Sequence, residues 1–268
     1  MSEDDTLYQQ LRGHMSRLKL TASAEALAGH LDTAQKSKPS YTQFLAELLD
    51  IEVKASEQRA LASRLRLAGL PSQKTLEEFD FDAQPTLDRR LIEELATTRF
   101  VAEKANVLFI GPPGVGKTTL AVALALKAVH AGYRVYYTTA ADLIDRTAKA
   151  ARQGRWQHTM RFWGGPQLLV IDELGYLPMA GEAAAHLFQV ISRRYQHGSI
   201  ALTTNRDITS WGEIFEDTTV AAAMLDRLLH HASVVQINGP SYRMRHHQAR
   251  LDKLRNGLKH PNQDGEFS

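Results

Sequence analysis

The chain contains no cysteine among its 268 residues, which excludes disulfides, thiolate nucleophiles and cysteine-based metal sites. It also has no long apolar run. The richest stretch, Leu120–Leu126, is followed by Lys127 and His130, well short of the roughly 20 apolar residues that span a bilayer. The acidic start, Met1–Asp5, lacks the apolar segment of a secretory signal. We therefore expect a cytoplasmic protein with no membrane partner.

An excess of charge of one sign is missing as well. The formal net charge is +2 and the sequence pI about 8.8, so the overall balance neither requires nor excludes a nucleic-acid partner. Eleven histidines are present, but His230-His231 and His246-His247 are adjacent pairs that would project in different directions from a helix. A structural zinc site is not expected. The 43% hydrophobic content is sufficient for a globular core.

The strongest motif is the stretch Gly111–Thr119, which reads GPPGVGKTT and fits G-x-x-x-x-G-K-[ST]. An apolar run, Asn106–Ile110, precedes it and a helix-forming segment follows. Glycines allow backbone N–H groups to surround a phosphate at a helix N-terminus. A plain Gly/Pro turn would not require a lysine and a hydroxyl at those two places. The predicted nucleotide-binding residues are Gly111, Pro112, Pro113, Gly114, Val115, Gly116, Lys117, Thr118 and Thr119.

Two acids follow a second apolar run, Leu168–Ile171. In open α/β sheets, ligands bind outside the carboxyl ends of the strands, so Asp172 and Glu173 should emerge beside the phosphate-binding loop. Asp172 is then the predicted partner of Thr118 in holding Mg²⁺, and Glu173 the candidate to orient and deprotonate water. Lys117 would reach the β- and γ-phosphates of ATP.

Further candidates are less specific. Asn205 follows the apolar run Ser199–Thr203, where its amide would hold water or a γ-phosphate oxygen, or merely close a turn. Phosphoryl transfer is commonly accelerated by an arginine. The residues alone leave four arginines open for that role: Arg193, Arg194, Arg227 and Arg243.

The first seventy residues show helical periodicity and no strand pattern. Leu7, Leu11, Met15 and Leu18 recur at helical spacing, as do Leu27 and Leu31. Ser40 and Gln43 form a capping-box pattern ahead of an apolar stripe that ends at Gly69 and Pro71. The opposite face should be charged, with Glu47, Asp50, Glu52, Lys54, Glu57 and Arg59. Such a stripe packs internally or binds a partner.

From residue 86 onward, strand patterns alternate with helix patterns, which predicts a parallel sheet with helices on both faces. The expected organisation is a helical, partner-binding N-terminal domain over 1–71, a linker over 72–85, an α/β nucleotide-binding domain over 86–260 and a disordered tail over 261–268. Phe79 and Phe81 would anchor the acidic linker to the second domain.

Basic side chains gather between the second and third expected strands, 134–138 and 168–171. They are Arg146, Lys149, Arg152, Arg155 and Arg161, and they lie among Trp156, Phe162 and Trp163. More follow the last expected strand, from Arg243 to Lys259. Lys149 and Arg152 are one helical turn apart, a spacing suited to phosphate contacts. A charged helix face is more often simply solvated.

Together these motifs resemble the AAA+ ATPases of the IstB-like transposition helper family, which is related to the bacterial replicative helicase loader. The matching words are GPPGVGKTTLA at 111–121, VIDELGYLP at 170–178, LTTNR at 202–206, and MLDRLLHHA at 224–232 followed by SYR at 241–243. Thr119 departs from the pattern, since the family more often has histidine there. The implied fold is a P-loop NTPase with a five-stranded parallel sheet flanked by helices, preceded by a small all-α domain.

The resemblance also implies roles for single residues. Lys117 would be the Walker A lysine, Asp172 and Glu173 the Walker B acids, and Asn205 sensor 1. Arg227 would be an arginine finger acting on a neighbouring subunit, and Arg243 the sensor 2 arginine. An extra helical segment over 146–163 would face DNA.

The implied function is an ATPase using ATP and Mg²⁺ that assembles as a ring or spiral on double-stranded DNA and recruits or stimulates a transposase. The alternatives are a helicase loader, a P-loop kinase acting on a small acceptor, and a nucleotide-gated scaffold without turnover.

Overall fold

The computed structural model describes residues 3–176, 179 and 181–242. The chain forms two compact units, Met1–Ser63 and Arg64–Ser268, and the boundary between them falls inside helix α3 (Tyr41–Ala68). The expected tail over 261–268 lies outside the described residues. Within the described part, no helix combines the length and the apolar character needed to cross a membrane.

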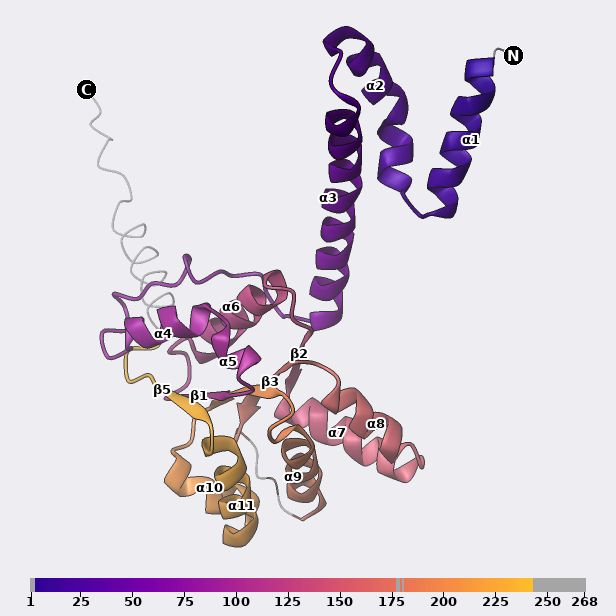
Figure 1. The fold of residues 1–268 in the computed structure, drawn as a ribbon. Coiled ribbons are helices and arrows are strands. Elements are labelled where there is room, and N and C mark those ends of the chain that lie inside the picture. Colours follow the sequence, from indigo (N-terminus) through magenta and orange to yellow (C-terminus); the bar gives the residue numbers. More distant parts are fainter. Residues whose placement is uncertain (1–2, 177–178, 180, 243–268) are drawn as a thin grey trace, which may run out of the picture. The chain divides into compact units, whose positions relative to one another are not determined.

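The N-terminal unit is helical, with α1 (Glu3–Arg17), α2 (Thr21–Ser37) and most of α3 (Figure 1). Its small core consists of the buried residues Met15, Leu27 and Leu48, with Tyr8, Leu20, Ala24, Leu31 and Phe44 packed around them. The expected apolar stripe of α1 is therefore buried only at Met15. Leu7, Leu11 and Leu18 are exposed.

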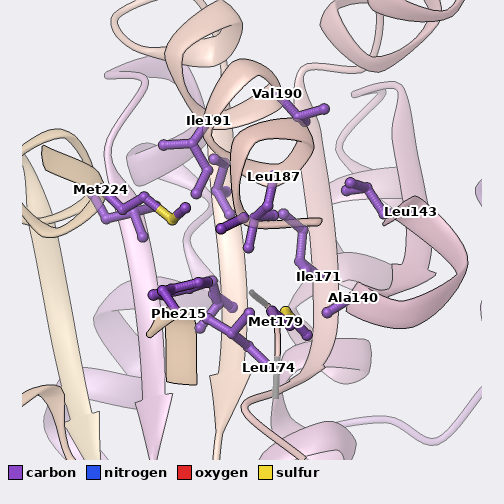
Figure 2. Packing of buried hydrophobic residues seen from close by; sticks show 14 of the residues in the cluster. Ala140, Leu143, Ile171, Leu174, Met179, Leu187, Val190, Ile191, Phe215 and Met224 are labelled. Carbon is purple, nitrogen blue, oxygen red and sulfur yellow. The ribbon is translucent and has the colours of Figure 1, made fainter. Parts of the chain in front are cut away.

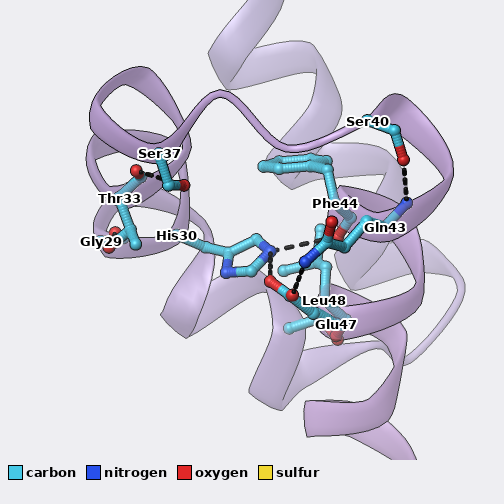
Figure 3. A network of polar contacts seen from close by, with 10 residues as sticks. Gly29, His30, Thr33, Ser37, Ser40, Gln43, Phe44, Glu47 and Leu48 are labelled. Carbon is cyan, nitrogen blue, oxygen red and sulfur yellow. Dashed lines mark hydrogen bonds and ion pairs between the residues drawn. The ribbon is translucent and has the colours of Figure 1, made fainter.

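The turn into α3 confirms half of the predicted capping box. The backbone N–H of Gln43 donates to Oγ of Ser40 at 3.2 Å, while the Gln43 side chain donates to Glu47 at 2.9 Å (Figure 3). The expected position of Glu52 on the charged face opposite the apolar stripe is wrong. Glu52 is 6% exposed and accepts hydrogen bonds from the Ser23 N–H at 3.0 Å and from Arg59 at 2.7 Å, because a donor at the start of α2 needs a partner.

The second unit is built on a parallel sheet in the order β2-β3-β4-β1-β5. This confirms the predicted five-stranded parallel sheet. Ile110 at the end of β1 pairs with Thr204 at the end of β4, so these strands finish at one edge. The strands are β1 (Asn106–Ile110), β2 (Val135–Thr139), β3 (Leu168–Leu174), β4 (Ser199–Thr204) and β5 (Ala232–Gln236).

Helices cover both faces of the sheet. Figure 1 shows α4 (Arg89–Ala96) and α6 (Lys117–His130) on one side and α9 (Glu182–Arg194), α10 (Trp211–Phe215) and α11 (Thr218–Leu229) on the other. The remaining helices are α5 (Arg99–Ala102), α7 (Ala140–Arg152) and α8 (Trp156–Gly164). Helix α10 was not expected from the sequence; it forms because Trp211 and Phe215 are wholly buried.

One core cluster joins α7–α11 to β3 and β4. Figure 2 shows Ile171 of β3 among Leu187, Val190 and Ile191 of α9, with Met224 of α11 on one side. Leu169 and Ile171 both face this cluster. Because side chains alternate along a strand, Leu168, Val170 and Asp172 face the opposite side, where α6 lies. The core thus aims Asp172 at the phosphate-binding loop.

Candidate nucleotide-binding site

The loop Gly111–Gly116 joins the end of β1 to the start of α6, as the motif predicts. Gly114 and Gly116 have φ values of 83° and 100°, a region that side-chain-bearing residues avoid. A Cβ on Gly116 would lie 2.7 Å from Cε2 of Phe79, and one on Gly114 would lie 2.1 Å from Oγ of Ser241. Glycine is therefore favoured at both positions, because φ is positive and because a Cβ would lie too close to a neighbouring side chain.

Lys117 is held inside its own loop. The side chain is 4% exposed, and its ammonium donates to the carbonyl oxygens of Gly111 at 2.7 Å and Pro112 at 2.8 Å. The two carbonyls keep the ammonium at the loop in which the motif predicts that phosphate oxygens bind. Val115 is buried and fixes the loop against the core.

Asp172 is the centre of a hydroxyl cluster. The carboxylate is 2% exposed. Its Oδ1 accepts from the Thr118 hydroxyl at 2.9 Å and from the Thr203 hydroxyl at closer range, and its Oδ2 accepts from the Tyr137 hydroxyl at 2.6 Å. Within the described residues Asp172 has no ion pair. Burial, followed by the bond to Asp172, raises the pKa of Tyr137, so this phenol remains a donor.

Glu173 adopts an unusual backbone conformation. Its φ is 62°, and the pairing of β3 with β4 shifts register between Ile171 and Leu174. The Glu173 N–H donates to the Thr203 hydroxyl at 3.0 Å, while the side chain is exposed in the pocket beside the loop. Non-glycine residues at positive φ are strained and concentrate at functional sites. The bulge turns a carboxylate that would otherwise face the core towards the pocket.

The oxygen atoms of Thr118 and Asp172 fit a magnesium ion. Mg²⁺ prefers hard oxygen ligands and uses one or two carboxylates together with substrate phosphates. Oδ1 of Asp172 and Oγ1 of Thr118 already lie 2.9 Å apart beside the phosphate-binding loop. These two residues are the ones that would hold the ion.

A pocket of about 440 Å³ opens beside the loop. Its far wall comes from the linker and from the segment after β5. Tyr242 donates its N–H to the Gly114 carbonyl at 2.9 Å and its hydroxyl to the Asp80 carbonyl, and its ring lies 5.8 Å from that of Phe79. The lining residues are Lys74, Glu78, Phe79, Asp80, Gly114, Gly116, Lys117, Thr118, Thr119, Glu173, Tyr176 and Tyr242.

Asn205 follows β4 at the same edge. The Gly111 N–H donates to the carbonyl of Thr204. This bond places Asn205, the residue after Thr204, beside the loop. In the part of the chain that the structure describes, the buried Oδ1 of Asn205 has no hydrogen-bond partner. Buried polar atoms are normally paired, and this amide oxygen is able to accept a further hydrogen bond.

Arg227 lies elsewhere. It lines a second pocket, of about 170 Å³, together with Asn106 and Gly198, which mark the amino ends of β1 and β4. Its guanidinium donates to the Ala223 carbonyl at 2.9 Å and sits 4.7 Å from the ring centroid of Phe188. Arg227 is thus at the opposite edge of the sheet from Lys117. Arg243 lies outside the described residues.

The predicted DNA-facing side chains of α7 and α8 are exposed at Arg146, Lys149, Arg152, Arg155 and Arg161. Arg146 donates to the Tyr136 hydroxyl at 2.5 Å. The neighbouring tryptophans do not share this exposure: Trp163 is wholly buried and Trp156 packs against the core. The surface is therefore suited to phosphate contacts rather than to base stacking by tryptophan.

The model of the family described as IstB-like ATP binding protein matches residues 13–250. The chain belongs to this family. It is 40% identical over 245 residues to the insertion sequence IS5376 putative ATP-binding protein of Geobacillus stearothermophilus, covering 91% of this chain and 98% of the relative. It is 43% identical over 231 residues to the insertion sequence IS21 putative ATP-binding protein of Pseudomonas aeruginosa, covering 86% and 87%.

Solved structures confirm the AAA+ fold of this IstB-like chain. AMPPCP-bound DnaA from Aquifex aeolicus superposes with a TM-score of 0.54 at 19% identity, covering 69% of this chain and 56% of that one. The sequence resemblance to the family and the predicted fold class are both confirmed.

The site residues that were not singled out from the sequence include Tyr137, Thr203 and Tyr242. The alternation in β2 and β4 could have shown which face each strand residue occupies. It could not have shown that both strands flank Asp172, because that depends on strand order.

Proposed function

We propose that this chain is an ATP-dependent regulator of DNA transposition that assembles on duplex DNA and recruits or stimulates a transposase. ATP hydrolysis would then disassemble or reset the assembly. The observation that carries the proposal is the bond between Thr118 and Asp172, which unites the phosphate-binding loop and the acidic strand end in one site. The insertion-sequence relatives support the link to transposition.

Within the site, each side chain has a distinct task. Lys117 binds the β- and γ-phosphates, and Thr118 and Asp172 hold Mg²⁺, which when bound neutralises phosphate charge. Glu173 orients water and accepts its proton, since its bulged backbone presents the carboxylate to the pocket. Asn205 offers its unpartnered Oδ1 to the same water.

The arginine that completes this site comes from a neighbouring subunit. Arg227 lies at the amino-end edge of the sheet, away from its own Lys117, so it can reach a phosphate only in another copy of the chain. Its guanidinium is half-buried and has no carboxylate partner among the described residues, which leaves its charge available. A ring or spiral of copies would repeat this pairing. Arg243, as a sensor 2 arginine, belongs to the same proposal.

Duplex DNA would bind along the exposed basic side chains of α7 and α8. Contacts from lysine and arginine to phosphates give affinity without base specificity. The apolar stripe on the helix that follows Ser40, in the N-terminal unit, is the surface that we propose for binding the transposase.

Glu173→Gln tests the catalytic assignment. The amide keeps the shape of the side chain but cannot accept a proton, so ATP hydrolysis should fall about a hundredfold or more while ATP binding persists. Steady-state phosphate release and binding of a fluorescent ATP analogue measure the two effects. With ATP, the variant should also stay bound to a labelled duplex longer than wild type.

Wild-type turnover in Glu173→Gln would remove the assignment of Glu173. Tighter binding of single-stranded than of duplex DNA would favour the helicase-loader alternative. Phosphate transfer to an added small acceptor would favour a kinase, and DNA binding that follows ATP occupancy without turnover would favour a scaffold.

A mixing experiment tests the arginine in trans. Lys117→Ala should lose ATP binding and Arg227→Ala should lose hydrolysis, so each variant alone should be nearly inactive. When they are mixed on duplex DNA, some interfaces combine the intact Lys117 of one variant with the intact Arg227 of the other, and hydrolysis should reappear. Equal inactivity of the mixture and the separate variants would show that Arg227 does not act across an interface.

A further inference from the structure

The carboxylate of Asp172 accepts hydrogen bonds from side chains on both neighbouring strands. Thr203 comes from β4 and Tyr137 from β2, and these strands flank β3 on either side. The third donor, Thr118, comes from α6. A buried carboxylate is costly unless its oxygens are hydrogen-bonded, so these contacts stabilise the charge. They also fix the direction in which each oxygen points.

The two carboxylate oxygens of Asp172 have different hydrogen-bond donors. Oδ1 is shared by Thr118 and Thr203, and it lies on the side of the phosphate-binding loop. Oδ2 accepts from Tyr137 at 2.6 Å, and no other donor to it occurs among the described residues. A phenol that holds Oδ2 can keep its bond while Oδ1 serves another ligand.

We propose that Tyr137 is a positioning residue that fixes the Asp172 carboxylate for Mg²⁺ by binding Oδ2 and leaving Oδ1 for the ion. The inference rests on the proposed ATP-binding function. A partner that orients a ligating carboxylate commonly changes metal affinity by about 10- to 100-fold when it is removed. Tyr137 itself would contact neither nucleotide nor metal.

The strand supplies a matched control. Tyr136 is the residue before Tyr137 and points to the other face, where its ring lies 4.9 Å from that of Phe162 and 5.8 Å from that of Trp163. Its hydroxyl accepts from the exposed Arg146. Tyr136→Phe and Tyr137→Phe therefore remove the same atom from adjacent residues, but only the second touches Asp172.

The experiment measures binding of a fluorescent ATP analogue to the full chain without DNA, first in EDTA and then across a Mg²⁺ titration. Tyr137→Phe should bind the analogue in EDTA as wild type does, because Lys117 and the loop are unchanged. Its half-saturating Mg²⁺ concentration should rise about tenfold. Tyr136→Phe should match wild type in both conditions, and Asp172→Asn should lose most of the gain in affinity that Mg²⁺ provides.

Each outcome is decisive. A wild-type Mg²⁺ response in Tyr137→Phe, while Asp172→Asn loses its response, overturns the inference and leaves the proposed function intact. Weaker binding of Tyr137→Phe already in EDTA, or an equal loss in Tyr136→Phe, shows a structural role of the strand and overturns it too. Failure of wild type to bind the analogue would instead contradict the proposed function. Manganese in place of Mg²⁺, followed by electron paramagnetic resonance, provides a second readout that does not depend on turnover.

Discussion

The two ends of the parallel sheet each hold a buried charge, but they hold it in different ways. At the carboxyl end, Asp172 is bound by the side-chain hydroxyls of Thr118, Tyr137 and Thr203. At the amino end, Arg194 is 1% exposed and bound by backbone carbonyls. Its guanidinium donates to the carbonyls of Trp163 at 2.7 Å, Pro166 at 3.0 Å, Gln167 at 3.3 Å and Ser199 at 2.8 Å.

The difference lies in what the partners can do. Side-chain hydroxyls rotate and can exchange one partner for a ligand, whereas loop carbonyls are fixed by the chain. Burial lowers the pKa of Arg194 to about 10, which leaves it charged at neutral pH. Arg194 therefore ties the α8–β3 loop to β4. Burial of a charged side chain does not by itself indicate a functional role. Side-chain hydroxyl partners are typical of a ligand-binding site, whereas backbone carbonyl partners are typical of a charge that stabilises the fold.

The largest effect should follow Arg194→Met. The change leaves four carbonyls without their donor. Each buried acceptor left unsatisfied costs about 1 to 3 kcal/mol, so the summed loss should exceed that of any single broken hydrogen bond. Urea unfolding should show this loss to the same extent with and without Mg²⁺-ATP, since the residue takes no part in ligand binding.

The control for that variant is the adjacent Arg193, which is exposed. Arg193→Met should change the free energy of unfolding by no more than about 0.5 kcal/mol. If both variants were equally stable, the carbonyl cage around Arg194 would carry no structural role and the contrast between the two ends of the sheet would disappear.

A smaller loss of stability, but a larger loss of activity, should follow Thr203→Val. The hydroxyl of Thr203 donates to Asp172 and accepts from the Glu173 N–H, so its removal takes one hydrogen bond from the buried Asp172 carboxylate and leaves the part-buried Glu173 N–H unpaired, at a cost of about 1 to 3 kcal/mol. Both acids lose a support, and ATP turnover should fall by more than the change in stability explains. Urea unfolding and phosphate release measure the two effects.

Thr138→Val is the matched control. Thr138 is buried in β2, on the other side of β3 from Thr203, and within the part of the chain that the structure describes its hydroxyl donates to the carbonyl of Thr139 and not to Asp172. Turnover should survive this change. Equal turnover in the two variants would show that the Thr203 hydroxyl, which donates to Asp172, is no more important for hydrolysis than a hydroxyl elsewhere in the sheet.

Much of this arrangement was predictable because its signals are local. The bounds of β1, 106–110, match the apolar run before the loop, and β4 ends one residue beyond its predicted run. The end of β3 was not predicted, because the strand continues past Ile171 to Leu174. Helical periodicity places Glu52 one turn after the buried Leu48, on the same face, but it does not show that Ser23 of a different helix pairs with this carboxylate. The presence of α10 was missed for a similar reason, since Trp211 and Phe215 are buried by distant elements.

The sequence by itself determined the phosphate-binding loop, the paired acids and the parallel sheet, because each depends on short stretches whose chemistry is readable in order. Tertiary structure alone decided that Tyr137 and Thr203 also meet Asp172. The strand order β2-β3-β4 sets Tyr137 and Thr203 on either side of that carboxylate, and strand order is a long-range property that no local pattern encodes. The same sheet separates Arg227 from Lys117, for the physical reason that parallel strands begin at one edge and end at the other.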